Sequence, residues 1–397
     1  MNKLLHNLEP SSTLELNQLA KKMASEGKSV INLTAGEPDF NTPDRIIAAA
    51  EKAMRDGKTK YTPVSGIPEL RSEIVTHIKQ LYQREYSIDE ILVSNGGKQA
   101  IFNLCYTLLN PGDEVLIPSP SWVSYKSMIE MVGAHPVIIP SGIEKKFEPD
   151  LKAIESQISP KTKLLILNSP NNPSGAVFSK KFFQELESLL LKYSNLFVLT
   201  DDIYEKFVYG DAFYSIAMSP KISKERLIII GGVSKTYSMT GWRVGYAAGP
   251  KKIITTMSNV QSQTTSNVCS ISQWAAVEAF QGSSDEEIRG YLELFKKRRD
   301  LAYETLSKIQ DVSCLKPEGA FYIFPCLEKF LDKKTPTGKK IETDADLSYY
   351  LLQEKGLASV PGSAFGLSGY IRFSFVVSFE SWNEGAKRLE AGLMDLS

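Results

Sequence analysis

Residues 226–235 read RLIIIGGVSK, an apolar run that ends in two glycines, a serine and a lysine. Similar runs precede polar residues at 163–170 (KLLILNSP) and at 195–204 (NLFVLTDDIY). Short apolar runs bounded by turn-forming residues are typical of strands that are buried on both faces. The three segments therefore predict strands of one buried sheet.

Helical patterns alternate with strand patterns through the middle of the chain. Further strand-like segments lie at 90–97 (EILVSNGG), 113–120 (DEVLIPSP) and 135–140 (HPVIIP), and helix-like segments at 97–109, 122–133, 151–158 and 180–193. This alternation predicts an α/β domain with a mostly parallel central sheet. Parallel strands of such a sheet are joined by right-handed crossovers.

The pattern changes after about residue 250. Helical patterns cover 257–280 and 285–309, and the rest mixes helices with the short strands GAFYIFP (319–325) and YIRFSFVV (370–377). A chain of 397 residues exceeds one ordinary core. We predict a large domain over 45–290 and a smaller α+β domain formed by both chain ends, 1–44 and 291–397.

Composition limits the function classes. Lysine plus arginine equals aspartate plus glutamate at 46 each, so we expect no capture of nucleic acid or of an anionic membrane. The N-terminus lacks a signal-peptide core, and no apolar stretch could span a bilayer. The four cysteines form no CxxC pair, so we expect no metal site and a reducing, cytoplasmic setting. Three scattered histidines make histidine-based acid–base chemistry an unlikely basis for catalysis.

Residues that follow the strands are the candidates for function, because ligands of open α/β sheets bind at the carboxyl ends of the strands. Gly97 and Lys98 open a helix that could hold a phosphate, although an ordinary turn explains them equally well and no nucleotide motif is present. Trp122 could stack on a flat ring or belong to a core. NSPNNPSG is a turn by composition, but a turn does not require both Asn171 and Asn172.

The sharpest signals follow the two strands at 195–204 and 226–235. Asp201 at the end of a buried strand needs a partner, and either a protonated ring nitrogen or a helix N-cap position would explain it. Lys235 at the mouth of an apolar strand could serve as a nucleophilic amine, although most lysines are simply exposed. Arg243 offers a planar fork that suits a phosphate. A ring nitrogen, an aldehyde and a phosphate together describe pyridoxal 5′-phosphate (PLP).

Several motifs, in order along the chain, resemble the class I PLP-dependent aminotransferases, most of all the bacterial aspartate aminotransferases. They are LTAGEPDF, TKYTPVSGIPELR, GGKQA, NSPNNPSGAV, TDDIYE and SKTYSMTGWRVG. The resemblance covers nearly the whole chain. It implies the PLP-dependent transferase fold type I, a cytoplasmic enzyme of amino acid metabolism, and a homodimer whose active sites are shared between subunits.

The resemblance also implies roles for individual residues. Lys235 would form the Schiff base and carry out the 1,3-proton transfer, Asp201 would pair with the ring nitrogen, and Tyr204 and Asn172 would bind the ring oxygen. Trp122 would stack on the ring. The phosphate would be bound by Gly97, Lys98, Ser234, Arg243 and, from the partner subunit, Tyr61. The substrate α-carboxylate would be bound by Arg372, Asn172 and the backbone of Gly36, and a distal carboxylate by Lys98, Ser12 and Thr13. Many relatives have Ser where this chain has Gly232, so one phosphate donor is absent.

The implied reaction is L-aspartate plus 2-oxoglutarate to oxaloacetate plus L-glutamate. Aromatic, prephenate or alanine transamination is the alternative within the same chemistry. A C–S β-lyase, or an enzyme like aminocyclopropane-carboxylate synthase, would use the same fold for another reaction. Two further alternatives are a PLP-sensing regulator, which would carry a DNA-binding extension, and a nucleotide-binding α/β protein, which would carry a phosphate-binding motif.

Overall fold

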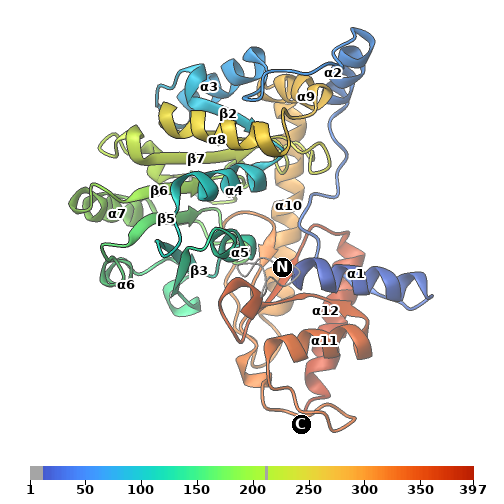
Figure 1. Ribbon diagram of the computed structural model, residues 1–397. Coiled ribbons are helices and arrows are strands. Elements are labelled where there is room, and N and C mark those ends of the chain that lie inside the picture. Colours follow the sequence, from blue (N-terminus) through green and yellow to red (C-terminus); the bar gives the residue numbers. More distant parts are fainter. Residues whose placement is uncertain (1–11, 211–212) are drawn as a thin grey trace.

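The computed structural model describes residues 12–210 and 213–397 (Figure 1). A seven-stranded sheet forms its centre, in the order β2-β8-β7-β6-β5-β3-β4. The strands are β2 (Ile91–Ser94), β3 (Glu114–Ser119), β4 (His135–Pro140), β5 (Thr162–Asn168), β6 (Phe197–Asp201), β7 (Leu227–Gly232) and β8 (Gly245–Ala248). Only β8 runs antiparallel to its neighbours β2 and β7, so the sheet is mostly parallel, as predicted.

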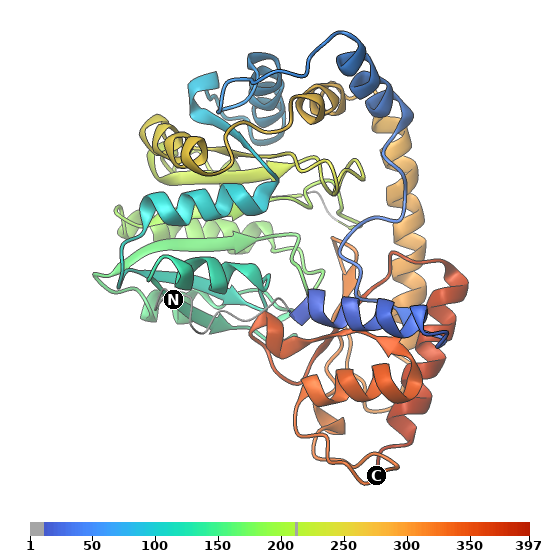
Figure 2. The same ribbon diagram turned by 45° about the vertical axis from the view of Figure 1, so that its right-hand side comes forward.

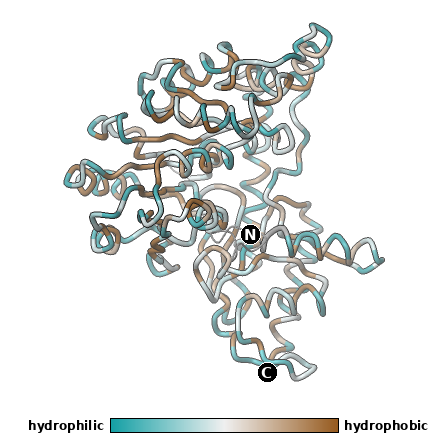
Figure 3. Tube along the Cα trace, viewed as in Figure 1, coloured by the Kyte–Doolittle hydropathy of each residue, from teal (hydrophilic) through white to brown (hydrophobic). Residues whose placement is uncertain are grey.

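Each strand of the sheet divides its side chains between two cores. In β7, Leu227 and Ile229 join one core, while Ile228 and Ile230 join the other, because successive side chains of a strand point to opposite faces. The first face is covered by α2 (Asp44–Arg55), α3 (Pro68–Tyr82), α6 (Leu151–Ser156), α7 (Lys180–Lys192) and α9 (Ser270–Phe280). The second is covered by α4 (Gly97–Leu108), α5 (Ser124–Met131) and α8 (Lys251–Thr264). Continuous apolar strands are thus buried on both sides, and Figure 3 shows the hydrophobic stretches gathered along them.

The helical pattern over 257–280 forms two helices instead of one. Helix α8 ends at Thr264 and α9 begins at Ser270. Between them, Ser266 has a φ of 60°, which lies in the left-handed region and interrupts a right-handed helix. The short segment that results turns the chain from the second face of the sheet to the first.

Both chain ends form a second region, which we call the terminal region (residues 12–43 and 307–397). It contains α1 (Ser12–Ser25), β1 (Ile31–Asn32), β9 (Tyr322–Ile323), α11 (Asp344–Lys355), β10 (Leu357–Ala358), β11 (Val360–Pro361), β12 (Ile371–Ser374) and α12 (Phe379–Met394). Strand β1 pairs with β10, and β12 lies between β11 and β9. Figures 1 and 2 both show α1 beside the C-terminal helices. Leu16, Ala20 and Met23 of α1 pack against Leu352 and Ala358.

Helix α10 (Asp285–Leu306) connects the two regions as one long helix (Figure 2). Its Ile288 belongs to the core on the first face of the sheet, while Phe295, Ala302 and Leu306 belong to the core of the terminal region. The predicted domain boundary at residue 290 falls inside this helix and stays a prediction. In the part of the chain that the structure describes, no helix is both long and apolar enough to cross a membrane.

Candidate active site

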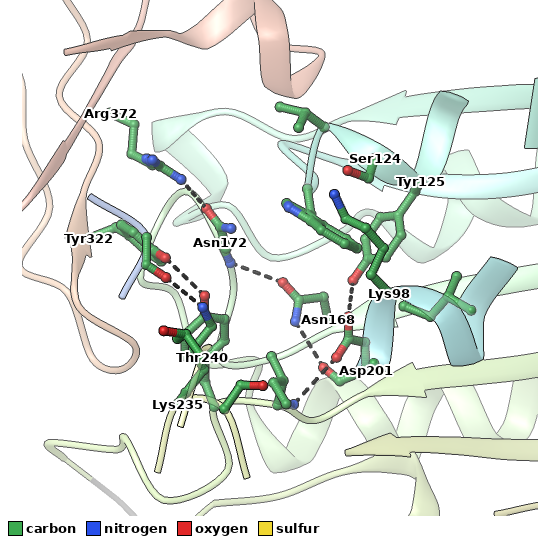
Figure 4. Close-up of a pocket in the computed structure, with 18 of the residues that line it drawn as sticks. Lys98, Ser124, Tyr125, Asn168, Asn172, Asp201, Lys235, Thr240, Tyr322 and Arg372 are labelled. Carbon is green, nitrogen blue, oxygen red and sulfur yellow. Dashed lines mark hydrogen bonds between the residues drawn. The ribbon is translucent and has the colours of Figure 1, made fainter. Parts of the chain in front are cut away.

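A cavity of about 280 Å³ lies where the carboxyl ends of the parallel strands face the terminal region (Figure 4). It brings together most of the residues that the sequence singled out: Gly36, Gly97, Lys98, Trp122, Asn172, Asp201, Tyr204, Ser234, Lys235, Arg243 and Arg372. Asn168 and Asp201 are the last residues of β5 and β6 and lie side by side in register. The edge at which parallel strands end thus places side chains from distant parts of the sequence in one cavity.

Three predicted residues are not assigned to this cavity by the described part of the chain. Tyr61 is 92% exposed and does not line it. Ser12 and Thr13 begin helix α1, but their side chains lie outside the described part of the chain. Their predicted roles therefore stay predictions.

Lys235 lies just past β7, and its Nζ donates a hydrogen bond to the carbonyl oxygen of Gly36. Burial is the main reason why the pKa of this amine falls to about 8, and the positive charges of Arg243 and Arg372 lower it further. Glu37 and Asp201 act in the opposite direction. A lysine whose pKa lies this close to neutrality can present the unprotonated amine that a nucleophile or a general base requires.

Asp201 is buried, with one carboxylate oxygen 2.6 Å from the Tyr125 hydroxyl that donates to it. Among the residues that the structure describes, the other oxygen accepts only a long bond of 3.4 Å from the backbone N–H of Ile203. Burial raises the pKa of Asp201 to about 6, against the lowering effects of Tyr125, Ile203 and Lys235. A cation placed in the cavity beside this carboxylate would favour its ionised form, because opposite charges stabilise each other when both are desolvated.

The NSPNNPSG turn contains two asparagines with different tasks. Asn171 holds the turn itself: its Nδ2 donates to the Pro120 carbonyl, and its Oδ1 accepts from the backbone N–H and the hydroxyl of Ser174. Asn172 faces the cavity, where its Oδ1 accepts from Arg372 Nη1 at 3.0 Å. Asn168 connects the turn to the sheet, because it accepts from the Asn172 N–H at 3.0 Å and donates to the Asp201 carbonyl at 2.8 Å.

Arg372 is 2% exposed and lies in β12 of the terminal region, opposite the strand ends (Figure 4). Its Nη2 donates to the Thr34 carbonyl at 2.8 Å, and its guanidinium carbon lies 4.4 Å from the centre of the Tyr322 ring. Nε is buried and has no hydrogen-bond partner among the described residues. Because no carboxylate of the described chain neutralises this guanidinium, it is suited to bind the carboxylate of a ligand.

Glycines bring the remaining cations and the N-terminus of α4 to the cavity. The Arg243 guanidinium lies against Gly96, where a Cβ would be 2.4 Å from Arg243 Nη2. A Cβ on Gly245 would lie 2.3 Å from the backbone nitrogen of Gly97, the first residue of α4. The glycines thus let Arg243 and β8 pack closely against the start of α4. Gly97, Ser234 and Arg243 all line the cavity, an arrangement that suits a phosphate.

The same close packing explains Gly232. A Cβ at this position would lie 2.9 Å from the Gly245 Cα and 3.0 Å from the Val244 carbonyl oxygen, in the neighbouring antiparallel strand. The approach of β7 to β8 thus requires glycine in this backbone. A serine here would have to push the two strands apart.

Lys98 and Trp122 lie beside each other in the cavity wall, with Lys98 Nζ over the Trp122 ring, 4.9 Å from its centre. Burial and the charge of Arg243 lower the pKa of Lys98. Among the described residues that line the cavity, four side chains are cationic, Lys98, Lys235, Arg243 and Arg372, and one is acidic, Asp201. This balance favours a ligand or ligands that carry several negative charges.

Several cavity residues were missed by reading only the strand ends: Asn168, Ser124, Tyr125, Ile203, Thr240 and Tyr322. Asn168 could have been found, because it is the first residue of NSPNNPSG and the last residue of β5. Tyr125 lies in a helix, and Tyr322 lies in a two-residue strand more than 100 positions after Asp201. Neither carries a local sequence signal, because only the fold brings them to the cavity.

Comparison with known proteins identifies the family of this chain. Residues 28–389 match the family model for aminotransferases of class I and II. A probable aspartate/prephenate aminotransferase of Rickettsia felis is 44% identical over 99% of this chain and 96% of its own length. An aspartate/prephenate aminotransferase of Cereibacter sphaeroides is 41% identical over 99% of this chain and 98% of its own length.

Solved structures agree as well. The aspartate aminotransferase of Rhizobium meliloti superimposes with a TM-score of 0.95 at 41% identity, over 100% of this chain and 99% of that chain. The aspartate aminotransferase of Thermus thermophilus, solved with maleate, gives 0.92 at 35% identity, over 98% and 99%. The predicted α/β fold and the predicted family are confirmed, and the chain belongs to the class I and II aminotransferases.

Proposed function

We propose that this aminotransferase transfers the amino group of L-aspartate to 2-oxoglutarate, with PLP bound through Lys235. The observation that carries the proposal is the position of Lys235 in a cavity that has Asp201 among the strand ends and Arg372 on the opposite wall. The names of the relatives support aspartate as the donor, and maleate in the Thermus structure is a four-carbon dicarboxylate like aspartate.

The residues of the cavity fit PLP at each of its groups. The α4 N-terminus at Gly97, with Ser234 and Arg243, suits the phosphate. Asp201 suits a protonated ring nitrogen, and Tyr204 suits the ring oxygen. Bound PLP supplies an aldehyde that condenses with amines and a ring that accepts the electron pair released at the substrate Cα.

Asp201 holds the proton on the ring nitrogen in this proposal. Tyr125 fixes one carboxylate oxygen and leaves the other to the cavity. The pKa of about 6 reflects burial, and pairing with the ring cation shifts the carboxyl toward ionisation. Trp122 lines the same cavity and would pack against the ring of bound PLP.

With PLP bound, Lys235 would serve as the general base that takes the proton from the substrate Cα and delivers it to the cofactor C4′. Its lowered pKa keeps a useful fraction of the amine unprotonated near neutral pH. Arg372 binds the α-carboxylate, with Asn172 beside it, and so orients the Cα–H bond toward Lys235. Orientation of this kind matters because a misplacement of about 1 Å can cost on the order of 10²-fold in rate.

Lys98 is the proposed partner of the distal carboxylate of aspartate, with Ser12 and Thr13 of α1 as further candidates. Prephenate is the second candidate substrate, because the relatives from Rickettsia and Cereibacter are named for both aspartate and prephenate. Prephenate also carries two carboxylates, so it places the same demand on the cationic cavity.

The protein is proposed to act as a homodimer with shared sites. Tyr61 supports this arrangement, because a tyrosine that is 92% exposed on the single chain is available to reach a phosphate bound by a second subunit. Size-exclusion chromatography with light scattering tests the dimer. Tyr61→Phe should weaken PLP binding if the hydroxyl donates across the interface.

Borohydride reduction of the PLP-loaded protein, followed by peptide mass spectrometry, tests the attachment. The adduct is expected on Lys235, and an adduct on another residue, or none, would refute the proposal. Lys235→Ala should remove the visible absorbance of the bound cofactor and reduce turnover by at least about 10²–10⁴-fold, the usual contribution of a general base. Lys251→Ala, on the far surface helix α8, is the control.

A panel of amino acids with 2-oxoglutarate, together with glutamate and prephenate, tests the substrate. Aspartate is expected to be the best donor. Product formation that does not depend on the oxo acid would instead indicate a C–S β-lyase, and a preference for alanine or aromatic donors would overturn aspartate while leaving the aminotransferase intact.

A further inference from the structure

Tyr322 and Tyr204 meet across the boundary between the two regions of the molecule. Tyr322 lies in β9 of the terminal region, and Tyr204 lies three residues past the end of β6. Their hydroxyl oxygens are 2.9 Å apart, and the residues are 1% and 3% exposed. Both side chains line the cavity. One hydrogen bond therefore joins the sheet side of the site to the Arg372 side.

The two tyrosines have more hydroxyl protons than hydrogen bonds between them. Two phenols hold two protons and share one hydrogen bond, and neither hydroxyl has another partner within residues 12–210 and 213–397. One O–H group is thus available to a ligand in the cavity. If an anionic ligand oxygen accepts from Tyr204, then Tyr322 must be the donor to Tyr204.

Arg372 favours this direction of donation. Its guanidinium carbon lies 4.4 Å from the centre of the Tyr322 ring, so the cation draws electron density away from that ring and makes its hydroxyl the stronger donor. Burial raises the pKa of Tyr322, and the Arg372 charge opposes that rise. The charge of Arg372 also lowers the pKa of Tyr204, whereas Asp201 raises it. Glu37 raises the pKa of Tyr322.

We propose that Tyr322 is a positioning residue of this site: its hydroxyl donates to Tyr204, which leaves the Tyr204 hydroxyl free to donate to the ring oxygen of the cofactor. The inference rests on the proposed function, because it requires PLP in the cavity. It adds a path by which the two ends of the cavity influence each other. A substrate carboxylate that neutralises Arg372 weakens the Tyr322 donor, and through Tyr204 it makes the ring oxygen more basic.

The first test is a pH titration of the visible absorbance of the PLP-loaded protein. Tyr204→Phe should raise the apparent pKa of the chromophore, because the ring oxygen loses a donor. Tyr322→Phe keeps the aromatic ring and removes only the hydroxyl. It should raise this pKa by about 10–30% of the Tyr204→Phe shift, the usual size of cooperative strengthening in a hydrogen-bond chain.

Tyr209→Phe is the matched control. Tyr209 is also buried, donates to a backbone carbonyl, that of Ala320, and has the Arg299 guanidinium carbon 5.0 Å from its ring centre, but it does not line the cavity. Its loss should leave the chromophore titration unchanged. A shift in Tyr209→Phe as large as that in Tyr322→Phe would show that any buried hydroxyl has this effect and would overturn the proposal.

The second test uses maleate as a probe of the carboxylate site. Saturating maleate should raise the chromophore pKa of the unmodified enzyme, and Tyr322→Phe should show a smaller maleate-induced rise. Tyr322→Leu also removes the ring beneath Arg372, so it should raise KM for the amino acid several-fold, whereas Tyr322→Phe should leave KM within about twofold. Equal KM effects in both variants, with thermal unfolding confirming that each is folded, would reduce Tyr322 to a packing role.

The two proposals fail in different ways. An unmodified protein that develops no visible band with PLP contradicts the proposed function. A normal band that titrates identically in the unmodified enzyme and in Tyr322→Phe, with and without maleate, contradicts only the role of Tyr322.

Discussion

The two walls of the cavity are built differently. The wall formed by the sheet takes Asp201, Ser234, Lys235 and Trp122 from positions at or just past strand ends. The wall formed by the terminal region takes Arg372 and Tyr322 from strands of four and two residues and Gly36 from a loop. A regular sheet thus holds the proposed cofactor side, while short strands anchored by both chain ends hold the proposed substrate side. The difference suggests that changes on the sheet wall affect chemistry and changes on the terminal wall affect binding.

After Lys235→Ala, the largest effect is expected for Asp201→Asn, which tests the sheet wall. An amide cannot hold the ring-nitrogen proton as a carboxylate does, so kcat should fall by about 10²–10³-fold, the scale for removing one preorganised electrostatic group. KM for aspartate should change little. Steady-state kinetics against Asp202→Asn gives the contrast, because Asp202 does not line the cavity. An equal fall in kcat in the two variants would contradict the separate role given to Asp201.

Arg372→Lys tests the opposite wall. Lysine keeps the charge but loses the planar fork that binds a carboxylate with two parallel bonds. KM for the amino acid should rise by about 10²-fold, which corresponds to roughly 3 kcal/mol for lost charge-assisted hydrogen bonds. The apparent pKa of the chromophore without substrate should change little compared with this rise in KM. An unchanged KM would place the α-carboxylate elsewhere.

Asp202→Asn tests the protein core behind the sheet wall. Asp202 accepts from Thr200 at 2.6 Å, Ser215 at 2.8 Å and Tyr82 at 3.0 Å, and burial raises its pKa to about 7. A raised carboxyl pKa means that the folded state binds more protons, so this group costs stability as the pH rises from about 4 through about 7. In PLP-free protein, the variant should lose less stability over this range, by up to a few kcal/mol. Denaturant unfolding at pH 5 and pH 8 measures it, and a slope equal to that of the parent would contradict the raised pKa.

Lys98→Gln separates the two carboxylates of the substrate. Loss of one charged donor should raise KM for aspartate by about tenfold, on the scale of 1.5 kcal/mol for such a bond. KM for alanine, which has no distal carboxylate, is the internal control and should change by less than about threefold. If KM rises equally for aspartate and for alanine, Lys98 binds the phosphate and not the distal carboxylate.

Gly232→Ser has the smallest expected effect on activity and sharpens the account of the sheet wall. The added Cβ would meet Gly245 and the Val244 carbonyl, so the variant should lose about 1–3 kcal/mol of stability from overpacking. PLP affinity should fall or stay the same. Thermal unfolding and PLP titration measure both, and tighter binding would indicate that the strands separate enough for a new phosphate donor.

The sheet and the strand-end residues could be predicted because their signal is local. An apolar run that ends in a polar residue identifies both the strand and the side chain at its carboxyl end, as with Asp201 and Lys235. Strand β8 (GYAA) was not predicted, because a four-residue segment with glycine and two alanines carries no clear strand periodicity. Its place between β2 and β7 depends on close packing at Gly232 and Gly245. The break between α8 and α9 was missed because residues 265–269 (TSNVC) contain neither glycine nor proline, so no strong helix-stop residue marks it.

The sequence by itself determined the α/β fold, the family and which strand-end residues are candidates for function, since each depends on short-range patterns of hydrophobicity and on motifs that stay together along the chain. Only the tertiary structure decided that Tyr125 holds Asp201, that Asn168 joins Asn172 to Asp201, and that Tyr322 bridges Tyr204 and Arg372. The physical reason is distance along the chain. Apart from the Asn168–Asn172 bond, which spans four positions, these hydrogen bonds join residues 33 to 118 positions apart, so they form only after the core has packed and no local pattern records them.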